Sequence, residues 1–120
     1  MAFEDRVNEA LGIVRRDLST HSNPPIGLSV TDIEGTVHIE LGGDVYGGDP
    51  LYERVLNGVD ALLVAVADAV QTLVSYNAGD EVWPVCPSHG YGLHPELTSS
   101  AVWVCRPHDH TVSRIGELAP

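Results

Sequence analysis

A chain of 120 residues, 43% of them hydrophobic, is long enough for one globular domain or one domain with a small appendage. Its net charge of −11, with six arginines and no lysine, argues against binding to phosphate backbones, and the missing lysine excludes Schiff-base chemistry. The opening residues have neither a basic stretch nor an apolar one. We therefore expect a cytoplasmic protein that binds neither nucleic acid nor membranes.

The first predicted element is an amphipathic helix over residues 3–18, because apolar side chains recur there at helical spacing. They are Phe3, Val7, Leu11, Val14 and Leu18. Pro24 and Pro25 follow and cannot continue a helix. Two alternating stretches, 26–30 and 37–41, then predict a β-hairpin with its turn at 33–35. The glycine-rich stretch 42–50 predicts turns, and 51–56 fits either a strand or a helical turn.

A second helix is predicted over residues 59–76, and it is apolar over most of its circumference. Such a helix needs cover on several sides, which the first helix and the hairpin, or a second copy of the chain, would supply. We therefore predict a possible homodimer through this helix. Its most apolar part, 59–74, is short for a membrane span and contains Asp60 and Asp68.

Residues 81–120 predict a small β unit, appended to or packed on a body formed by residues 1–80. Short strands are expected at 82–85, 92–97, 101–104 and 111–115. Cys86 and Cys105 each follow the end of a strand, where a tight turn begins. The whole chain is thus predicted to be an α+β protein: a helix, a hairpin or small sheet, a long apolar helix and a β unit at the carboxyl end.

The β unit contains a cysteine–histidine pattern that favours one metal ion. Cys86-Pro87-Ser88-His89 and Cys105-Arg106-Pro107-His108 each place a thiol and an imidazole three positions apart. Two such turns joined by a hairpin can close a tetrahedral shell, and two sulfurs with two nitrogens favour Zn²⁺ over Mg²⁺ or Ca²⁺. The alternatives are a Cys86–Cys105 disulfide, which a reducing compartment disfavours, or two reduced cysteines without a metal.

The fourth ligand is open at this point. His108 fits the repeated spacing, but His110 would share its face on an alternating strand. His94, in the hairpin between the two turns, is a third possibility, and Asp109 could orient a ligand imidazole.

This segment resembles a zinc ribbon, whose turn reads Cys-Pro-x-Cys-Gly. Cys86-Pro87-Ser88-His89-Gly90 matches it with histidine in the second ligand place, and Cys105-Arg106-Pro107-His108 matches the second turn, followed by Asp109 in place of glycine. The resemblance implies a ligand set of Cys86, His89, Cys105 and His108. The chain also resembles small bacterial proteins that share a Cys-Pro-x-His segment and a later Val-Trp-Val-Cys strand, a resemblance that implies no activity.

A shell filled by protein leaves no place for water or substrate, so we predict a non-catalytic protein with a structural zinc site that acts through protein–protein interaction or assembly. One alternative is a zinc metalloenzyme with an open coordination position, although the chain has no known catalytic motif. Another is an acidic inhibitor or nucleic-acid mimic that binds a basic protein surface. Residues 22–81, with ten acids and one arginine, motivate that alternative.

Overall fold

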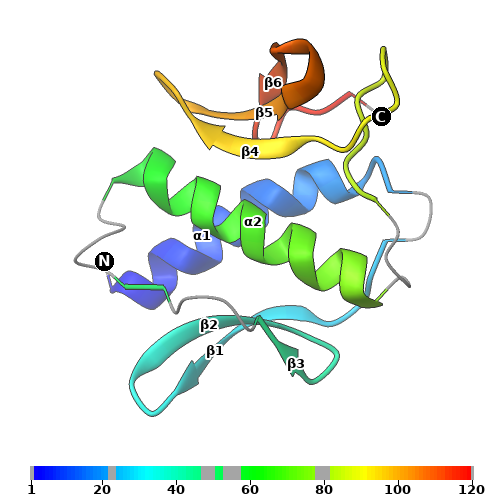
Figure 1. The fold of residues 1–120 in the computed structure, drawn as a ribbon. Coiled ribbons are helices and arrows are strands. Elements are labelled where there is room, and N and C mark those ends of the chain that lie inside the picture. The colour runs from blue at the N-terminus through cyan, green and yellow to red at the C-terminus, as the bar shows by residue number, and fades with distance from the viewer. Residues whose placement is uncertain (1, 22–23, 47–50, 53–57, 78–81, 120) are drawn as a thin grey trace.

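In the computed structural model, which describes residues 2–21, 24–46, 51–52, 58–77 and 82–119, two helices lie between two antiparallel sheets (Figure 1). The middle layer holds α1 (Phe3–Leu18) and α2 (Val59–Asn77). The first sheet is formed by β1 (Leu28–Ile33), β2 (Thr36–Leu41) and β3 (Asp44–Val45). The second is formed by β4 (His94–Leu97), β5 (Ala101–Cys105) and β6 (His110–Arg114). The predicted α+β class is confirmed.

Helix α1 has the bounds that its sequence pattern predicts. Val7, Leu11 and Val14 are fully buried, as the spacing of its apolar side chains requires. Acidic side chains occupy the first turn and Arg15 and Arg16 the last, which suits the helix dipole at both ends. The buried face also carries one carboxylate, Asp17, which the apolar pattern does not reveal.

The predicted hairpin is confirmed as β1 and β2, with a shift at its start and a tighter turn. Ile26 lies outside β1 and is 94% exposed, whereas Ile33 pairs with Thr36. The turn is therefore two residues long. Glu34 (φ +52°) and Gly35 (φ +84°) both have left-handed backbones, the form that matches strand twist, and the Gly35 N–H donates to Asp32 Oδ1 at 2.8 Å.

Residues 51–56, which fit either a strand or a helical turn by sequence, are described in the structure only at Leu51 and Tyr52. Leu51 forms a single bridge with Val37, and residues 53–57 lie outside the described residues. Of the glycine-rich loop, Gly42 and Gly43 form a turn with positive φ that leads into β3. Residues 47–50 of that loop also lie outside the described part.

Helix α2 is covered from within the chain by α1 and by both sheets. Its exposed positions in the described chain include Val59, Asp68, Thr72 and Tyr76. By length and composition alone this 19-residue helix could cross a membrane, as many core helices could. In this structure 44% of its most apolar 18-residue stretch is buried inside the protein. A homodimer through α2 stays a prediction, and it would have to use those exposed positions.

The second sheet packs on the helices and shares their core. All five residues of β5 are buried, and β4 and β5 both contact α2. The predicted strand at 82–85 is reduced to one bridge, between Val85 and Gly92. The apolar core therefore continues across the predicted boundary between residues 80 and 81.

Candidate metal centre

The first cysteine turn is a tight loop from Cys86 to Tyr91. The Cys86 N–H donates to the Tyr91 carbonyl at 2.8 Å, and the Gly90 N–H donates to the Cys86 carbonyl at 2.9 Å. Gly90 closes the loop with φ +77°, a backbone that glycine adopts without strain. The loop buries the Cys86 side chain and leaves His89 exposed above it.

The second cysteine turn begins where β5 ends. Residues Arg106–His108 form a turn of 3₁₀-helix, which Asp109 ends in a left-handed conformation with φ +47°. The chain then reverses, so that His110 pairs directly with Cys105 across the β5–β6 hairpin. Because of this 3₁₀ turn, His108 and His110 do not belong to one alternating strand, and their side chains are oriented differently.

Three of the predicted ligand residues, Cys86, His89 and His110, meet at one point, and the sulfur of Cys105 lies beside His89. The Nδ1 atom of His89 lies 3.4 Å from the Cys86 Sγ and 3.6 Å from the Cys105 Sγ. The Nδ1 atom of His110 lies 3.9 Å from the Cys86 Sγ. The donor atoms of Cys86, His89 and His110 all lie within 4.8 Å of one another, a spacing suited to a metal ion. Both cysteines are free thiols.

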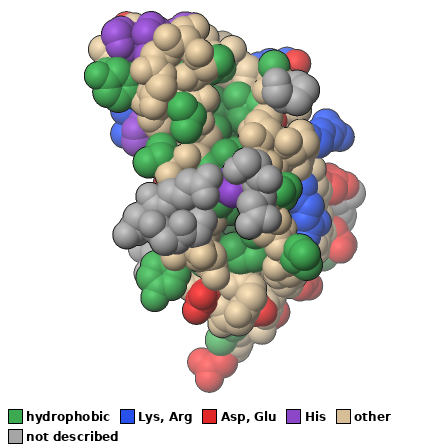
Figure 2. All heavy atoms as spheres, turned by 90° about the vertical axis from the view of Figure 1, so that its right-hand side faces the viewer, with side chains coloured by type: hydrophobic (Ala, Val, Ile, Leu, Met, Phe, Trp, Pro, Cys, Tyr) green, Lys and Arg blue, Asp and Glu red, His purple; other side chains and the backbone are tan. Residues whose placement is uncertain are grey.

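His108, the ligand implied by the repeated spacing, lies beside this group and contacts it through its ring. Its ring is stacked on the ring of His89, with centroids 3.7 Å apart and planes 9° from parallel. The His110 ring is instead perpendicular to the His89 ring, at 87° and 5.5 Å. The ring of Tyr91 lies near that of His108, with centroids 5.7 Å apart and planes tilted by 45°. Figure 2 shows these imidazoles gathered at the end of the molecule that carries the second sheet.

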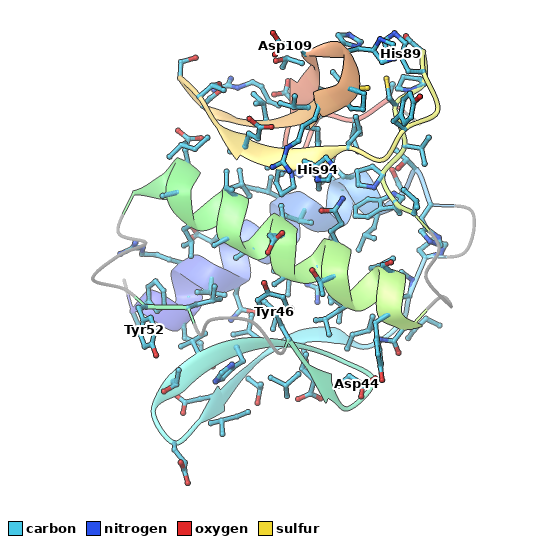
Figure 3. The ribbon with its side chains drawn as sticks, in the orientation of Figure 1. Asp44, Tyr46, Tyr52, His89, His94 and Asp109 are labelled. Carbon is cyan, nitrogen blue, oxygen red and sulfur yellow. The ribbon has the colours of Figure 1, made fainter. Side chains whose placement is uncertain are left out.

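The other two candidate residues lie away from the thiols. His94 is in β4, paired with Val104, and Figure 3 shows it between β4 and α2 rather than near His89. Asp109 is exposed on the 3₁₀ turn, and Figure 3 shows it separated from His89. The geometry therefore groups Cys86, His89 and His110, with the Cys105 sulfur beside His89 Nδ1 and the His108 ring stacked on the His89 ring.

Two groups of the centre, His89 and Cys105, have shifted pKa values. Partial desolvation lowers the pKa of His89, and repulsion from His108 and His110 lowers it further. Burial raises the pKa of the Cys105 thiol, as do the hydrogen bond and the charge of Cys86, whereas the His108 N–H opposes the rise. Without a metal ion the Cys105 proton is thus held more tightly than usual.

The strands that carry the cysteines are fixed to the helices by buried polar contacts. Trp103, two residues before Cys105, donates from Nε1 to Asp17 Oδ2 at 2.7 Å. The N–H groups of Gly116 and Leu118 donate to the same carboxylate at 2.6 Å and 3.0 Å. Near the other cysteine, Trp83 Nε1 donates to Thr20 Oγ1 at 3.0 Å. The site is therefore built on anchored segments.

No protein-family model, curated protein or solved structure matches this chain. The resemblance to zinc ribbons accordingly depends on the residues and geometry described above. What the structure contributes is a cysteine–histidine group with metal-binding geometry.

Proposed function

We propose that this chain is a non-catalytic protein in which Cys86, His89, Cys105 and His110 hold a structural Zn²⁺ ion in a ribbon-like unit. The observation that carries the proposal is the spacing of the donor atoms. With Zn–S near 2.3 Å and Zn–N near 2.0–2.1 Å, a tetrahedral ion separates sulfur from nitrogen by about 3.6 Å. Three of the four sulfur–nitrogen pairs in this set lie close to that value, at 3.4 Å (Cys86–His89), 3.6 Å (Cys105–His89) and 3.9 Å (Cys86–His110).

The orientation of the rings supports His110 rather than His108 as the fourth ligand. An imidazole nitrogen binds a metal through a lone pair in its ring plane, so the ion lies in the plane of every imidazole that binds it. The parallel planes of His89 and His108 share no such point near their nitrogens. The perpendicular planes of His89 and His110 intersect, so one ion can lie in both.

The donor chemistry supports zinc in a closed shell. Two thiolates and two imidazoles suit Zn²⁺, whereas Mg²⁺ and Ca²⁺ take oxygen ligands. A metalloenzyme would need one of the four positions left for water. The closeness of Cys105 Sγ to His89 Nδ1 favours a protein ligand in that position instead. Two free thiols also fit the reducing cytoplasm that we expect for this chain.

A filled site would stabilise the turns that expose apolar side chains for contact with a protein partner. Val82 is 57% exposed, Val85 45% and Tyr91 53%, and all three lie in or beside the first cysteine turn. Ion binding at a structural zinc site supplies on the order of 10 kcal/mol, which would hold such a surface in one shape. Apolar and aromatic side chains exposed together are typical of protein interaction sites.

Metal analysis tests the proposal directly. Protein purified without chelators should contain one Zn²⁺ per chain, and Co²⁺ substitution should give the intense visible bands of a four-coordinate thiolate site. Cys86→Ser and Cys105→Ser should lose both signals, whereas His94→Ala, at the imidazole outside the group, should retain them. A chain that binds no transition metal, or variants that all retain it, would overturn the proposed centre.

A second candidate function rests on the charge of the first sheet. Asp32, Glu34, Glu40 and Asp44 lie on β1–β3 or its turn, and residues 28–45 contain no arginine or lysine. Figure 2 shows acidic side chains at the end opposite the histidines. This favours contact with a basic protein surface. Binding that weakens steeply with added salt would support this contact, and binding indifferent to salt would contradict it.

A further inference from the structure

At the metal centre the ring of His108 is stacked on the ring of His89 and lies near the ring of Tyr91, a contact that the ligands alone do not require. Tyr91 and His89 come from the first cysteine turn, and His108 comes from the second. The ring of His108 is stacked on His89, with centroids 3.7 Å apart, and lies 5.7 Å from the ring of Tyr91. A side chain of the second turn thus packs onto an imidazole of the first.

We propose that His108 is a positioning residue of the metal centre and does not itself bind the ion. This inference rests on the proposed zinc site. His108 holds the ring plane of His89 so that Nδ1 faces both thiols, and it covers the outer side of the centre.

The position of His89 explains why such support matters. Its side chain is exposed, so burial in the core does not fix its ring. Nδ1 must nevertheless stay 3.4 Å from one sulfur and 3.6 Å from the other to complete the shell. Rotation of the ring would move Nδ1 away from both. The His108 ring, stacked with its centroid 3.7 Å from that of His89, opposes this rotation. The perpendicular ring of His110 restricts the rotation of His89 from another direction.

The same geometry explains why histidine follows Cys105 at the spacing of a ligand without acting as one. The 3₁₀ turn at Arg106–His108 places the His108 ring over His89. Outer groups that orient a metal ligand typically change metal affinity by about 10–100-fold when removed. His108 should contribute at the lower end of that range, because its contact is a stack and not a hydrogen bond.

Matched substitutions at positions 108 and 110 test the proposal. In His108→Phe the flat ring stays and the nitrogens are lost, whereas His108→Ala removes both. We expect His108→Phe to keep the four-coordinate Co²⁺ spectrum, with Zn²⁺ affinity and release rate to excess chelator within about threefold of wild type. His108→Ala should keep the spectrum but bind Zn²⁺ about tenfold more weakly. His110→Phe should lose the four-coordinate spectrum.

Two results would overturn the positioning role while leaving the metal centre standing. If His108→Phe loses the four-coordinate spectrum and His110→Phe keeps it, His108 is the ligand. If His108→Ala matches wild type in affinity and release rate, the stack has no role. A wild-type chain that takes up neither Co²⁺ nor Zn²⁺ overturns the proposed centre itself, and the role of His108 falls with it.

Discussion

Asp17 connects the end of α1 to the strand that carries Cys105, and its removal should destabilise the protein strongly. The carboxylate is fully buried and accepts three hydrogen bonds: two at Oδ2, from Trp103 Nε1 and the Gly116 N–H, and one at Oδ1, from the Leu118 N–H. Asp17→Ala leaves one buried donor, Trp103 Nε1, and two partly buried N–H groups without their acceptor.

The arrangement of these bonds sets the expected size of the effect. Each hydrogen bond to a charged acceptor contributes about 1.5–3 kcal/mol. The three bonds do not simply add up, because Asp17→Ala also removes the unfavourable free energy of burying the carboxylate charge. We therefore expect Asp17→Ala to lower the free energy of unfolding by about 3–5 kcal/mol. Asp17→Asn retains one oxygen, which serves the two donors at Oδ2, and turns its NH₂ toward the Leu118 N–H. It should cost about 1–3 kcal/mol.

Urea unfolding followed by tryptophan fluorescence measures both variants, since Trp83 and Trp103 lie in the affected region. Glu9→Ala is the matched control, because Glu9 is an exposed carboxylate on the same helix, and it should change stability by less than about 0.5 kcal/mol. If Asp17→Ala unfolds within about 1 kcal/mol of wild type, or if Asp17→Asn costs as much as Asp17→Ala, the carboxylate does not fix the strands as argued.

Three further predictions concern the metal, pH and one backbone position. Removing the ion with a chelator should lower the melting temperature and broaden amide signals of residues 86–110 first; unchanged spectra would contradict a structural ion. Metal affinity should rise with pH through neutrality, because the raised pKa of Cys105 keeps its thiol protonated and the ion must displace that proton. At His89 the lowered pKa means that protons compete with the ion only at a pH below the ordinary pKa of imidazole. A metal affinity that does not change with pH, measured by chelator competition, would refute this. Gly116→Ala should cost about 1–3 kcal/mol in chemical unfolding, because φ is +98° and its Cβ would lie 2.6 Å from Ile13 Cγ2, whereas Gly12→Ala, with open space and a helical backbone, should be neutral or stabilising.

Periodicity and turn chemistry predicted the elements of this fold because their causes are local. The spacing of apolar residues predicted both helices, and alternation on either side of a turn at 33–35 predicted the hairpin, whose turn in the structure is Glu34–Gly35. The packing of the helices between two sheets was not predictable in the same way, because it depends on which face of α2 packs against each sheet. Asp17 was also missed, because its three donors lie 86 to 101 positions away in the sequence.

At the candidate site the sequence identified the residue types and left one choice open. The repeated spacing favoured His108, whereas an alternating strand would have placed His108 and His110 on one face. The structure has a 3₁₀ turn at Arg106–His108 and a left-handed Asp109, which interrupt that alternation. A positive φ at a non-glycine residue is uncommon, so no pattern in the sequence signals it.

The central claim is that two thiolates and two imidazoles bind one ion, and X-ray absorption at the zinc edge of the purified protein tests it most directly. We predict one Zn²⁺ per chain with two sulfur neighbours near 2.3 Å and two nitrogen neighbours near 2.0–2.1 Å. A first shell of nitrogen and oxygen alone, or protein without stoichiometric metal, would contradict it.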